Sequence, residues 1–351
     1  MRLVSTSGFN EGVALARDLP ARQGEAPLLR AGVKLGQRHR GALLEAGVNR
    51  IYVDDDLGEG IEVPIPLSEA TRQEARGAIS RTFAEAKRMP GNLLSYELLD
   101  ELRAAAERIV AEVEALPDAP WCFADTAGPD GYTVEHPIDA TVIGLLIGRH
   151  LFRTRGRLDS AGERHYDAPS GLLLQLGLGL FLQDIGKLAL PPSIVHKPGP
   201  LDTDEWELMM RHPELGLEFL RDDGIGSLAK SVVRSHHERW DGAGYPSGTA
   251  GNRISQFARL AAVADAFDAV TSERYHRAAS PQNAGVAVIR EGAGSAFDPE
   301  LTEVFCEVVL PHPPGAEIDM PDGRTGVVAE ITEHGPVVRV AGSDCALAEA
   351  G

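Results

Sequence analysis

Two adjacent histidines open the stretch HHERWDGAGYP at residues 236–246, and an acid, a glycine and a rigid Gly-Tyr-Pro follow them. Imidazole nitrogens and carboxylate oxygens are ligands that suit divalent iron, manganese or zinc. Adjacent histidines on a helix point about 100° apart, so they serve two neighbouring metals more naturally than one. The stretch is therefore a candidate metal site if further ligands converge on it.

A second candidate ligand, Asp184, closes the very apolar segment GLLLQLGLGLFLQDIGKLALPP at residues 171–192. A helix this apolar is expected to be buried nearly all round, and a buried carboxylate is costly unless a cation compensates it. A metal meets this need, and so does Lys187, one helical turn further along the same face. Without other ligands, Asp184 and Lys187 would be a structural ion pair at a helix end.

Further candidate ligands stand at helix ends or inside apolar helices. His136 precedes Pro137, which suits the first residue of a helix. His212 lies in the predicted helix LDTDEWELMMRHPELG, whose start carries an N-cap signal at Asp202. Asp265 stands in the apolar run LAAVADAFDAV, where an acid needs a partner. Each histidine taken singly would be a surface or capping residue, but the arrangement as a whole favours a metal site.

The elements that must position these residues divide into four regions. The patterns predict a mainly α protein with a small N-terminal α/β segment (residues 1–65), a helical connector (66–120), a helical domain (121–310) and a short C-terminal β segment (311–351). In the C-terminal segment, Asp322-Gly323 is the usual signal of a hairpin. We expect these strands to cover the helical core, and the N-terminal region to be structural, a regulatory input or a dimerisation element.

The helix predicted at residues 94–117 carries an apolar stripe. The stripe consists of Leu98, Leu102, Ala105, Ile109 and Val113. Core packing or a connector role is favoured over a coil that would join two chains into a homodimer.

Composition limits the functions that the chain can perform. With 351 residues and 43% hydrophobic content it can form one large core or two to three smaller ones, and its net charge of −18 argues against DNA or RNA as a partner. A metal cluster with one or two basic residues can still hold a small phosphate-bearing ligand.

Location is also predicted from the sequence. The apolar run at residues 171–183 reads as too short to span a bilayer, and the mixed, polar residues 1–19 do not have the pattern of a secretion signal. Three scattered cysteines, Cys122, Cys306 and Cys345, fit a reducing compartment. The sequence therefore predicts a cytoplasmic protein without a membrane partner.

Over residues 125–310 the chain resembles the HD-GYP family, the metal-dependent phosphodiesterases of bacterial cyclic di-GMP signalling. The resemblance is carried by QDIGKLALPPSIVHKPGPL, RHPELG, HHERWDGAGYP and ADAFDAVTSER. It implies an all-helical HD bundle with two divalent ions of iron, manganese or zinc. It also implies hydrolysis of cyclic di-GMP to pGpG, GMP or both by a metal-bridged hydroxide.

The resemblance assigns roles to individual residues. Positions that match the metal ligands of the family are His136, Asp184, His212, His236, His237 and Asp265. Asp184 would bridge the ions, and Lys187 would contact the scissile phosphate as the second catalytic residue. Substrate-binding positions are Lys187, the loop residues Gly244, Tyr245 and Pro246, and the basic residues Arg274 and Arg277.

The chain departs from the family at several of these positions. Gln183 replaces the histidine of the HD pair, and its neutral carboxamide is a weaker ligand than imidazole. Tyr132 stands where members with three metals carry a glutamate, although Glu135 is close enough to substitute for it. Tyr275 and His276 replace a proline and a tyrosine. One metal position should therefore be weakened, and the pocket for the base should differ.

Three outcomes follow from these departures. The chain is an active phosphodiesterase, a slow one limited by metal loading, or a degenerate module that binds cyclic di-GMP or a signalling partner without cleavage. Hydrolysis is favoured, because a chain that had lost activity would be expected to lose more than one of these residues. A different metal-dependent phosphohydrolase activity is a further alternative.

Overall fold

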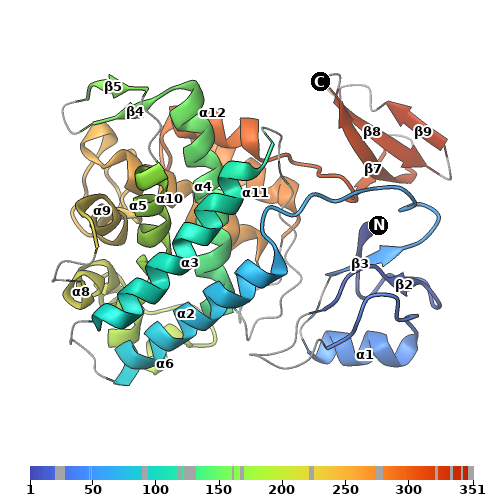
Figure 1. The fold of residues 1–351 in the computed structure, drawn as a ribbon, viewed down its shortest axis with the longest axis horizontal. Helices are drawn as coiled ribbons and strands as arrows, with labels where there is room; N and C mark the ends of the chain where they lie inside the picture. Colours follow the sequence, from blue (N-terminus) through green and yellow to red (C-terminus); the bar gives the residue numbers. More distant parts are fainter. Residues whose placement is uncertain are drawn as a thin grey trace.

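The computed structural model describes residues 1–19, 28–46, 48, 50–88, 94–117, 121, 132–159, 162–166, 170–220, 225–272, 280–320, 323–332, 335–340 and 343–346. Within these ranges the chain is mainly helical, with small sheets near both ends (Figure 1), so the predicted fold class is confirmed. The residue Cys122 and the turn residue Asp322 lie outside the described residues.

Nine helices of the described chain contribute to one hydrophobic core, which runs from Leu67 to Val309. They are α2 (Glu69–Arg88), α3 (Tyr96–Ala115), α4 (Tyr132–Thr154), α5 (Ser170–Leu182), α8 (His212–Phe219), α9 (Ser227–Ser235), α10 (Gln256–Thr271), α11 (Gln282–Glu291) and α12 (Pro299–Val308). Short elements connect them: the hairpin β4 (Arg157–Leu158) and β5 (Arg164–His165), η2 (Ile185–Ala189), α6 (Pro192–Val195), α7 (Thr203–Met209) and η3 (Gly251–Arg253).

The apolar helix α5 lies inside this core and packs against α3, α4 and α9. Gly171–Ala189 is, within the described chain, the one segment long and apolar enough to cross a membrane, and 61% of its most apolar window is buried in the fold. By length and composition it thus reaches what a span requires, where the sequence suggested that it falls short. Such burial is also what the central helix of a folded domain shows.

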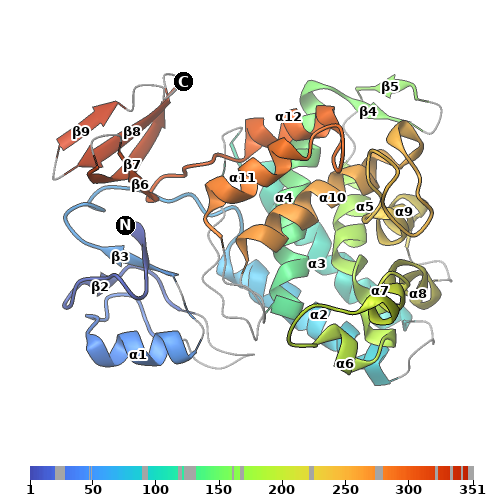
Figure 2. The same ribbon diagram turned by 180° about the vertical axis from the view of Figure 1, so that it is seen from behind.

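Helices α2 and α3 pack against each other and against the rest of the core (Figure 2). The predicted apolar stripe of α3 is buried throughout. Ser95 caps the helix, because its side chain accepts a hydrogen bond from the backbone N–H of Leu98. The stripe is therefore used for packing within the chain.

The two small sheets contact each other. In the N-terminal segment β3 (Arg50–Asp54) pairs with β1 (Arg2–Ser5) and β2 (Ala14–Leu15), next to α1 (Gln37–Glu45). The C-terminal strands form the antiparallel series β6 (Glu317–Asp319), β7 (Thr325–Thr332), β8 (Gly335–Val340) and β9 (Ser343–Ala346). Met320 and Gly323, between β6 and β7, belong to the predicted hairpin turn.

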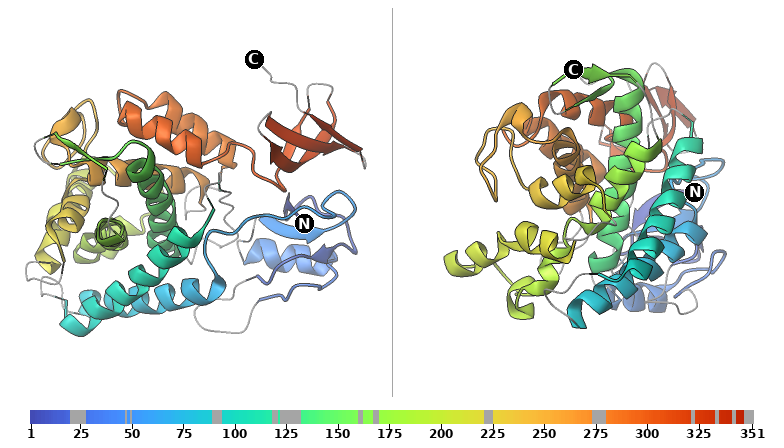
Figure 3. Two further views of the ribbon diagram at one scale, coloured as in Figure 1. Left: turned by 45° about the horizontal axis from the view of Figure 1, so that its top comes forward. Right: turned by 60° about the vertical axis from the view of Figure 1, so that its left-hand side comes forward.

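The expectation that the C-terminal strands cover the helical core is wrong. The sheet lies beside the N-terminal segment, to one side of the helices (Figures 1 and 3). The backbone N–H of Leu3 donates to the carbonyl of Gly315 at 2.8 Å, and Arg2 forms ion pairs with both Asp55 and Glu317. These contacts hold the sheet to the N-terminal segment, whereas the predicted region boundaries remain predictions.

Candidate metal centre

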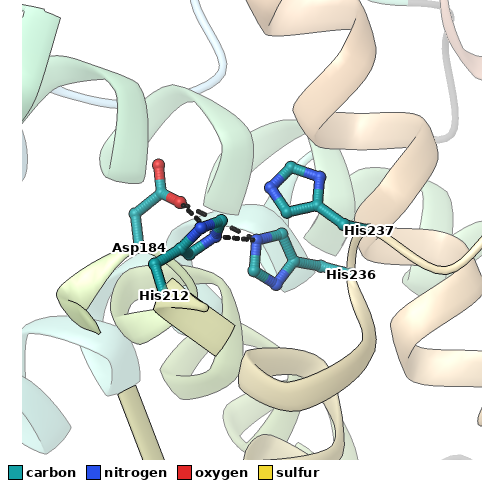
Figure 4. Close-up of side chains that lie close together, drawn as sticks. All are labelled: Asp184, His212, His236 and His237. Atoms are coloured by element: carbon teal, nitrogen blue, oxygen red, sulfur yellow. Dashed lines mark hydrogen bonds and ion pairs between the residues drawn. The ribbon is translucent and has the colours of Figure 1, made fainter. Parts of the chain in front are cut away.

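Four of the predicted ligands converge at one point in the helical domain (Figure 4). Asp184 precedes η2, His212 begins α8, and His236 and His237 follow the last turn of α9. One ligand atom from each of the four lies within 4.8 Å of the others. The set contains three imidazoles and one carboxylate, which suits iron, manganese or zinc.

A glycine allows two of these elements to approach closely. A Cβ atom added to Gly186 would lie 1.9 Å from the carbonyl oxygen of His212 and 2.5 Å from the backbone nitrogen of Gly216. No side chain fits there, so η2 lies directly against α8. This contact brings Asp184 next to His212.

The start of α8 differs from the prediction that His212 lies within one helix beginning after Asp202. The capping box of Asp202 and Glu205 is present, but the helix that it starts, α7, ends at Met209. Pro213 has no N–H to donate to the carbonyl of Met209 four residues earlier, which favours a break here. The Nδ1 atom of His212 takes this carbonyl at 2.8 Å instead.

Backbone hydrogen bonds fix how the imidazoles face the centre. The Nδ1 atom of His236 lies 3.1 Å from the carbonyls of Val232 and Val233, and Nδ1 of His212 lies 2.8 Å from the carbonyl of Met209. Since both Nδ1 atoms donate, the two Nε2 atoms present lone pairs to each other across 3.3 Å. Two acceptors at this distance repel each other unless a cation lies between them.

The carboxylate of Asp184 adds a third acceptor. Its Oδ1 lies 3.4 Å from Nε2 of His212 and 3.7 Å from Nε2 of His236, and this buried atom has no hydrogen-bond partner. A buried oxygen without a partner is costly. The residues present therefore fit a divalent cation, which would satisfy all three acceptors at once.

The protonation states agree with this assignment. Burial, with Lys187 nearby, lowers the pKa of His212 to about 3, and burial holds the pKa of His237 well below its usual value. Burial alone would raise the pKa of Asp184, but Lys187 and the surrounding histidines lower it well below its usual value. At neutral pH His212 and His237 are therefore neutral and Asp184 is charged, as metal binding requires.

The other predicted ligands form a second group beside the first. His136 Nε2 lies 3.1 Å from Oδ1 of Asp265 and 3.7 Å from Oδ2 of Asp184. The amide nitrogen of Gln183 donates to Oδ1 of Asp265 at 3.2 Å and lies 3.4 Å from Nε2 of His136. Asp184 is thus shared, with Oδ1 toward His212 and His236 and Oδ2 toward His136.

The residues of this second group, His136, Asp265 and Gln183, mostly pair with one another. Burial lowers the pKa of His136, but Asp265 and Asp268 outweigh burial and raise it to about 10. A protonated His136 between two carboxylates is an ion pair and carries no free lone pair for a metal. The buried Oε1 atom of Gln183 has no hydrogen-bond partner, so this carboxamide retains one free acceptor.

Asp268 is a candidate site residue that the sequence pattern did not identify. Its Oδ2 lies 2.5 Å from Nδ1 of His136, and its Oδ1 accepts from the hydroxyl of Ser272 at 2.8 Å. A carboxylate that orients a ligand histidine is a common feature of metal sites. The signal was present, since Asp268 lies three positions after Asp265 in an apolar helix and therefore on the same face.

Glu238 was missed as well. This buried carboxylate accepts hydrogen bonds from the backbone N–H groups of Ser247 (2.8 Å) and Thr249 (3.0 Å). These hydrogen bonds connect the loop after Gly-Tyr-Pro to the residues that follow the end of α9. Its position immediately after the two predicted ligands His236 and His237 was the feature of the sequence that could have pointed to it.

The predicted loop residues lie against the centre. The ring of Tyr245 stacks on His237, with centroids 4.7 Å apart and planes at 27°. A Cβ atom on Gly244 would lie 2.5 Å from the carbonyl of His237, so glycine permits this fold-back, and Pro246 follows Tyr245. Lys187 forms an ion pair with Oδ2 of Asp184 at 2.6 Å, and its side chain remains 32% exposed.

Three expectations at the edge of the site have different outcomes. Helix α4 begins at Tyr132 rather than at Pro137, which lies inside it. Glu135 is held by Arg72 and Arg76 of α2, so these ion pairs occupy the residue considered as a substitute ligand. The predicted substrate residues Arg274 and Arg277, and the departures Tyr275 and His276, lie outside the described residues.

Residues 154–301, which include this centre except for His136, match the family model HD_5, an HD domain. The chain therefore contains an HD domain, and the relatives it resembles are cyclic di-GMP phosphodiesterases. This confirms the resemblance inferred from the motifs. The matched region contains Asp184, the three clustered histidines and Asp265.

Proteins with similar sequences are named as cyclic di-GMP phosphodiesterases. The chain is 33% identical over 279 residues to cyclic di-GMP phosphodiesterase PA4108 of Pseudomonas aeruginosa, covering 78% of this chain and 63% of the relative. It is 36% identical over 175 residues to a cyclic di-GMP phosphodiesterase of Vibrio cholerae (46% and 36%). It is 42% identical over 129 residues to the cyclic di-GMP phosphodiesterase response regulator RpfG of Xanthomonas campestris pv. campestris (35% and 33%). The chain thus spans less than two thirds of the length of each of these relatives.

Proposed function

We propose that this chain is a metal-dependent phosphodiesterase that hydrolyses cyclic di-GMP to pGpG, GMP or both. The observation that carries the proposal is the buried set of acceptors on Asp184, His212 and His236, which needs a cation. The names of the relatives, cyclic di-GMP and 3'3'-cGAMP phosphodiesterases, support a cyclic dinucleotide as the substrate.

The geometry supports two positions for divalent ions with unequal affinity. The first uses Asp184, whose Oδ1 faces His212 and His236, together with those two histidines and His237. The second uses Oδ2 of Asp184 with His136 and Asp265, and has Gln183 as a weak ligand. Divalent ions in such a pair lower the pKa of water and clamp the oxygens of an in-line displacement.

The residues of the chain have complementary roles in this proposal. Lys187, whose ammonium group pairs with Asp184 and reaches solvent, would bind a phosphate oxygen and stabilise charge that grows on it. Tyr245 would keep water from the outer side of His237, because its ring covers that imidazole. Asp268 would hold His136 in a fixed orientation.

Gln183 is expected to slow the reaction. For the second ion to bind, the amide nitrogen of Gln183 must leave Asp265, and His136 must lose its proton. A carboxamide oxygen then replaces an imidazole as ligand. Losses outside the ligand set already cost about 10- to 100-fold in metal affinity or activity, so this change should cost at least as much.

The internal pairing of His136, Asp265 and Gln183 also favours a second candidate function. A chain that retains only the first ion would bind cyclic di-GMP, or a signalling partner, without cleaving it. Binding and turnover therefore have to be measured separately.

The test is hydrolysis of cyclic di-GMP at saturating manganese or iron, with chromatographic separation of pGpG and GMP. We expect slow turnover by the wild-type chain and at least tenfold faster turnover by Gln183→His. Tight binding with no product from either protein would contradict the phosphodiesterase and favour the binding module.

A further inference from the structure

We propose that Trp206 is the platform on which one guanine base of the cyclic dinucleotide stacks, and that it determines specificity for a base-bearing phosphodiester. The inference rests on the proposed function. It concerns α7, an element to which neither the motifs nor the predicted ligands assign a role in substrate binding.

Trp206 is exposed in a way that core packing does not explain. Its surface is 47% accessible, and none of the seven residues of α7 is buried. Large aromatic side chains usually contribute their area to a core or to an interface. Here the indole contributes little to the core and remains available to a ligand.

A series of aromatic contacts places Trp206 at the outer side of the metal centre. The rings of His237 and Tyr245 are stacked at 4.7 Å, and the ring of Tyr245 meets that of Trp206 edge-on at 6.0 Å and 81°. Tyr245 also lies 6.2 Å from His212. Trp206 is thus one ring beyond the histidine ligands, on the side of the centre that Tyr245 covers.

Both ends of α7 are fixed relative to the site. At its start, Glu205 forms the capping box with Asp202 and an ion pair with Lys197. At its end, the carbonyl of Met209 is bound by Nδ1 of His212. The indole is therefore held in place before a ligand arrives, which lowers the entropic cost of stacking.

The charge of α7 indicates which part of the ligand it meets. The helix carries Asp204, Glu205 and Glu207 and no basic residue. Such a helix repels phosphate but is compatible with a neutral base that carries N–H donors, as guanine does. Phosphate would instead be bound by the metal centre and Lys187.

The test compares Trp206→Ala with Leu208→Ala, a matched control two residues further and therefore on the other side of the same helix. The probe is a phosphorothioate analogue of cyclic di-GMP that resists hydrolysis. From the usual free energy of stacking between a base and an aromatic side chain, we expect Trp206→Ala to bind the analogue about 5- to 150-fold more weakly. We expect an unchanged dissociation constant for Leu208→Ala and partial recovery for Trp206→Phe.

Two further readouts separate stacking from damage to the centre. Metal content and the inhibition constant of inorganic phosphate, which has no base, should be the same in all variants. With hydrolysable cyclic di-GMP, KM should rise in Trp206→Ala while kcat stays constant. Equal dissociation constants for Trp206→Ala and Leu208→Ala would overturn the inference and leave the phosphodiesterase intact. Binding without cleavage by the wild-type chain would overturn the phosphodiesterase, and this comparison would still decide the role of Trp206.

Discussion

Replacing Gly186 by alanine tests whether the contact between η2 and α8 positions the metal ligands. The added Cβ would lie 1.9 Å from the carbonyl oxygen of His212, whereas real Cβ contacts are essentially never under 3.0 Å. The two elements must therefore separate by about 1 Å. Both neighbouring atoms belong to the backbone, so a side-chain rotation cannot relieve the clash.

The separation should affect stability and activity together. Overpacking a tight contact costs about 1–3 kcal/mol, which for a domain of this size lowers Tm by roughly 2–10 °C. A shift of about 1 Å at a catalytic site costs about 100-fold in rate. Because Asp184 moves away from His212, we also expect weaker retention of the metal.

The matched control is Gly177→Ala in α5. Its added Cβ would lie 3.7 Å from Cγ2 of Thr141, an ordinary contact, and alanine is favoured over glycine inside a helix by about 0.5–1 kcal/mol. Thermal unfolding, metal content after dialysis and turnover of cyclic di-GMP would be measured for both variants. If Gly186→Ala matches Gly177→Ala in all three, the reasoning about this contact is refuted.

The remaining predictions concern proton positions around the centre. Asp268→Asn should lower metal affinity at the His136 position about 10- to 100-fold, measured by manganese titration, and an unchanged affinity would show that Asp268 does not orient His136. After chelation, stability should fall as pH drops from 6.5 to 5, by up to about 1.4 kcal/mol per pH unit for each of His212 and His237. The reason is that burial lowers the pKa of both histidines in the folded chain, so that in this pH range only the unfolded chain binds protons at these residues. Urea unfolding at several pH values measures this slope, which His212→Gln should reduce by about half, and a flat profile would contradict the assigned pKa directions.

The residues of the centre could be found from sequence because they break a local rule. Asp184 follows one apolar helix and Asp265 lies inside another, and His236-His237 stands in a motif of high specificity. Such conflicts with simple burial are expected at functional sites. Their meeting in space, however, depends on Gly186, whose importance is visible only when α8 lies against it.

The misses have a common physical origin. Asp268 and Glu238 act through partners that periodicity does not reveal, one on another helix and the other in a loop. Likewise, the pairing of Arg2 with Glu317 joins residues 315 positions apart, and a strand pattern predicts a strand without naming its neighbour. Helix starts were also displaced, as at Tyr132, because element boundaries are weakly encoded.

The central claim is that Asp184, His212, His236 and His237 together bind a divalent cation. Elemental analysis of the wild-type chain, purified without oxygen and dialysed against metal-free buffer, tests it most directly. We predict about one equivalent of iron, manganese or zinc per chain, lost in His236→Gln. A wild-type chain that is free of metal and does not take up any of the three ions when they are added would contradict the account.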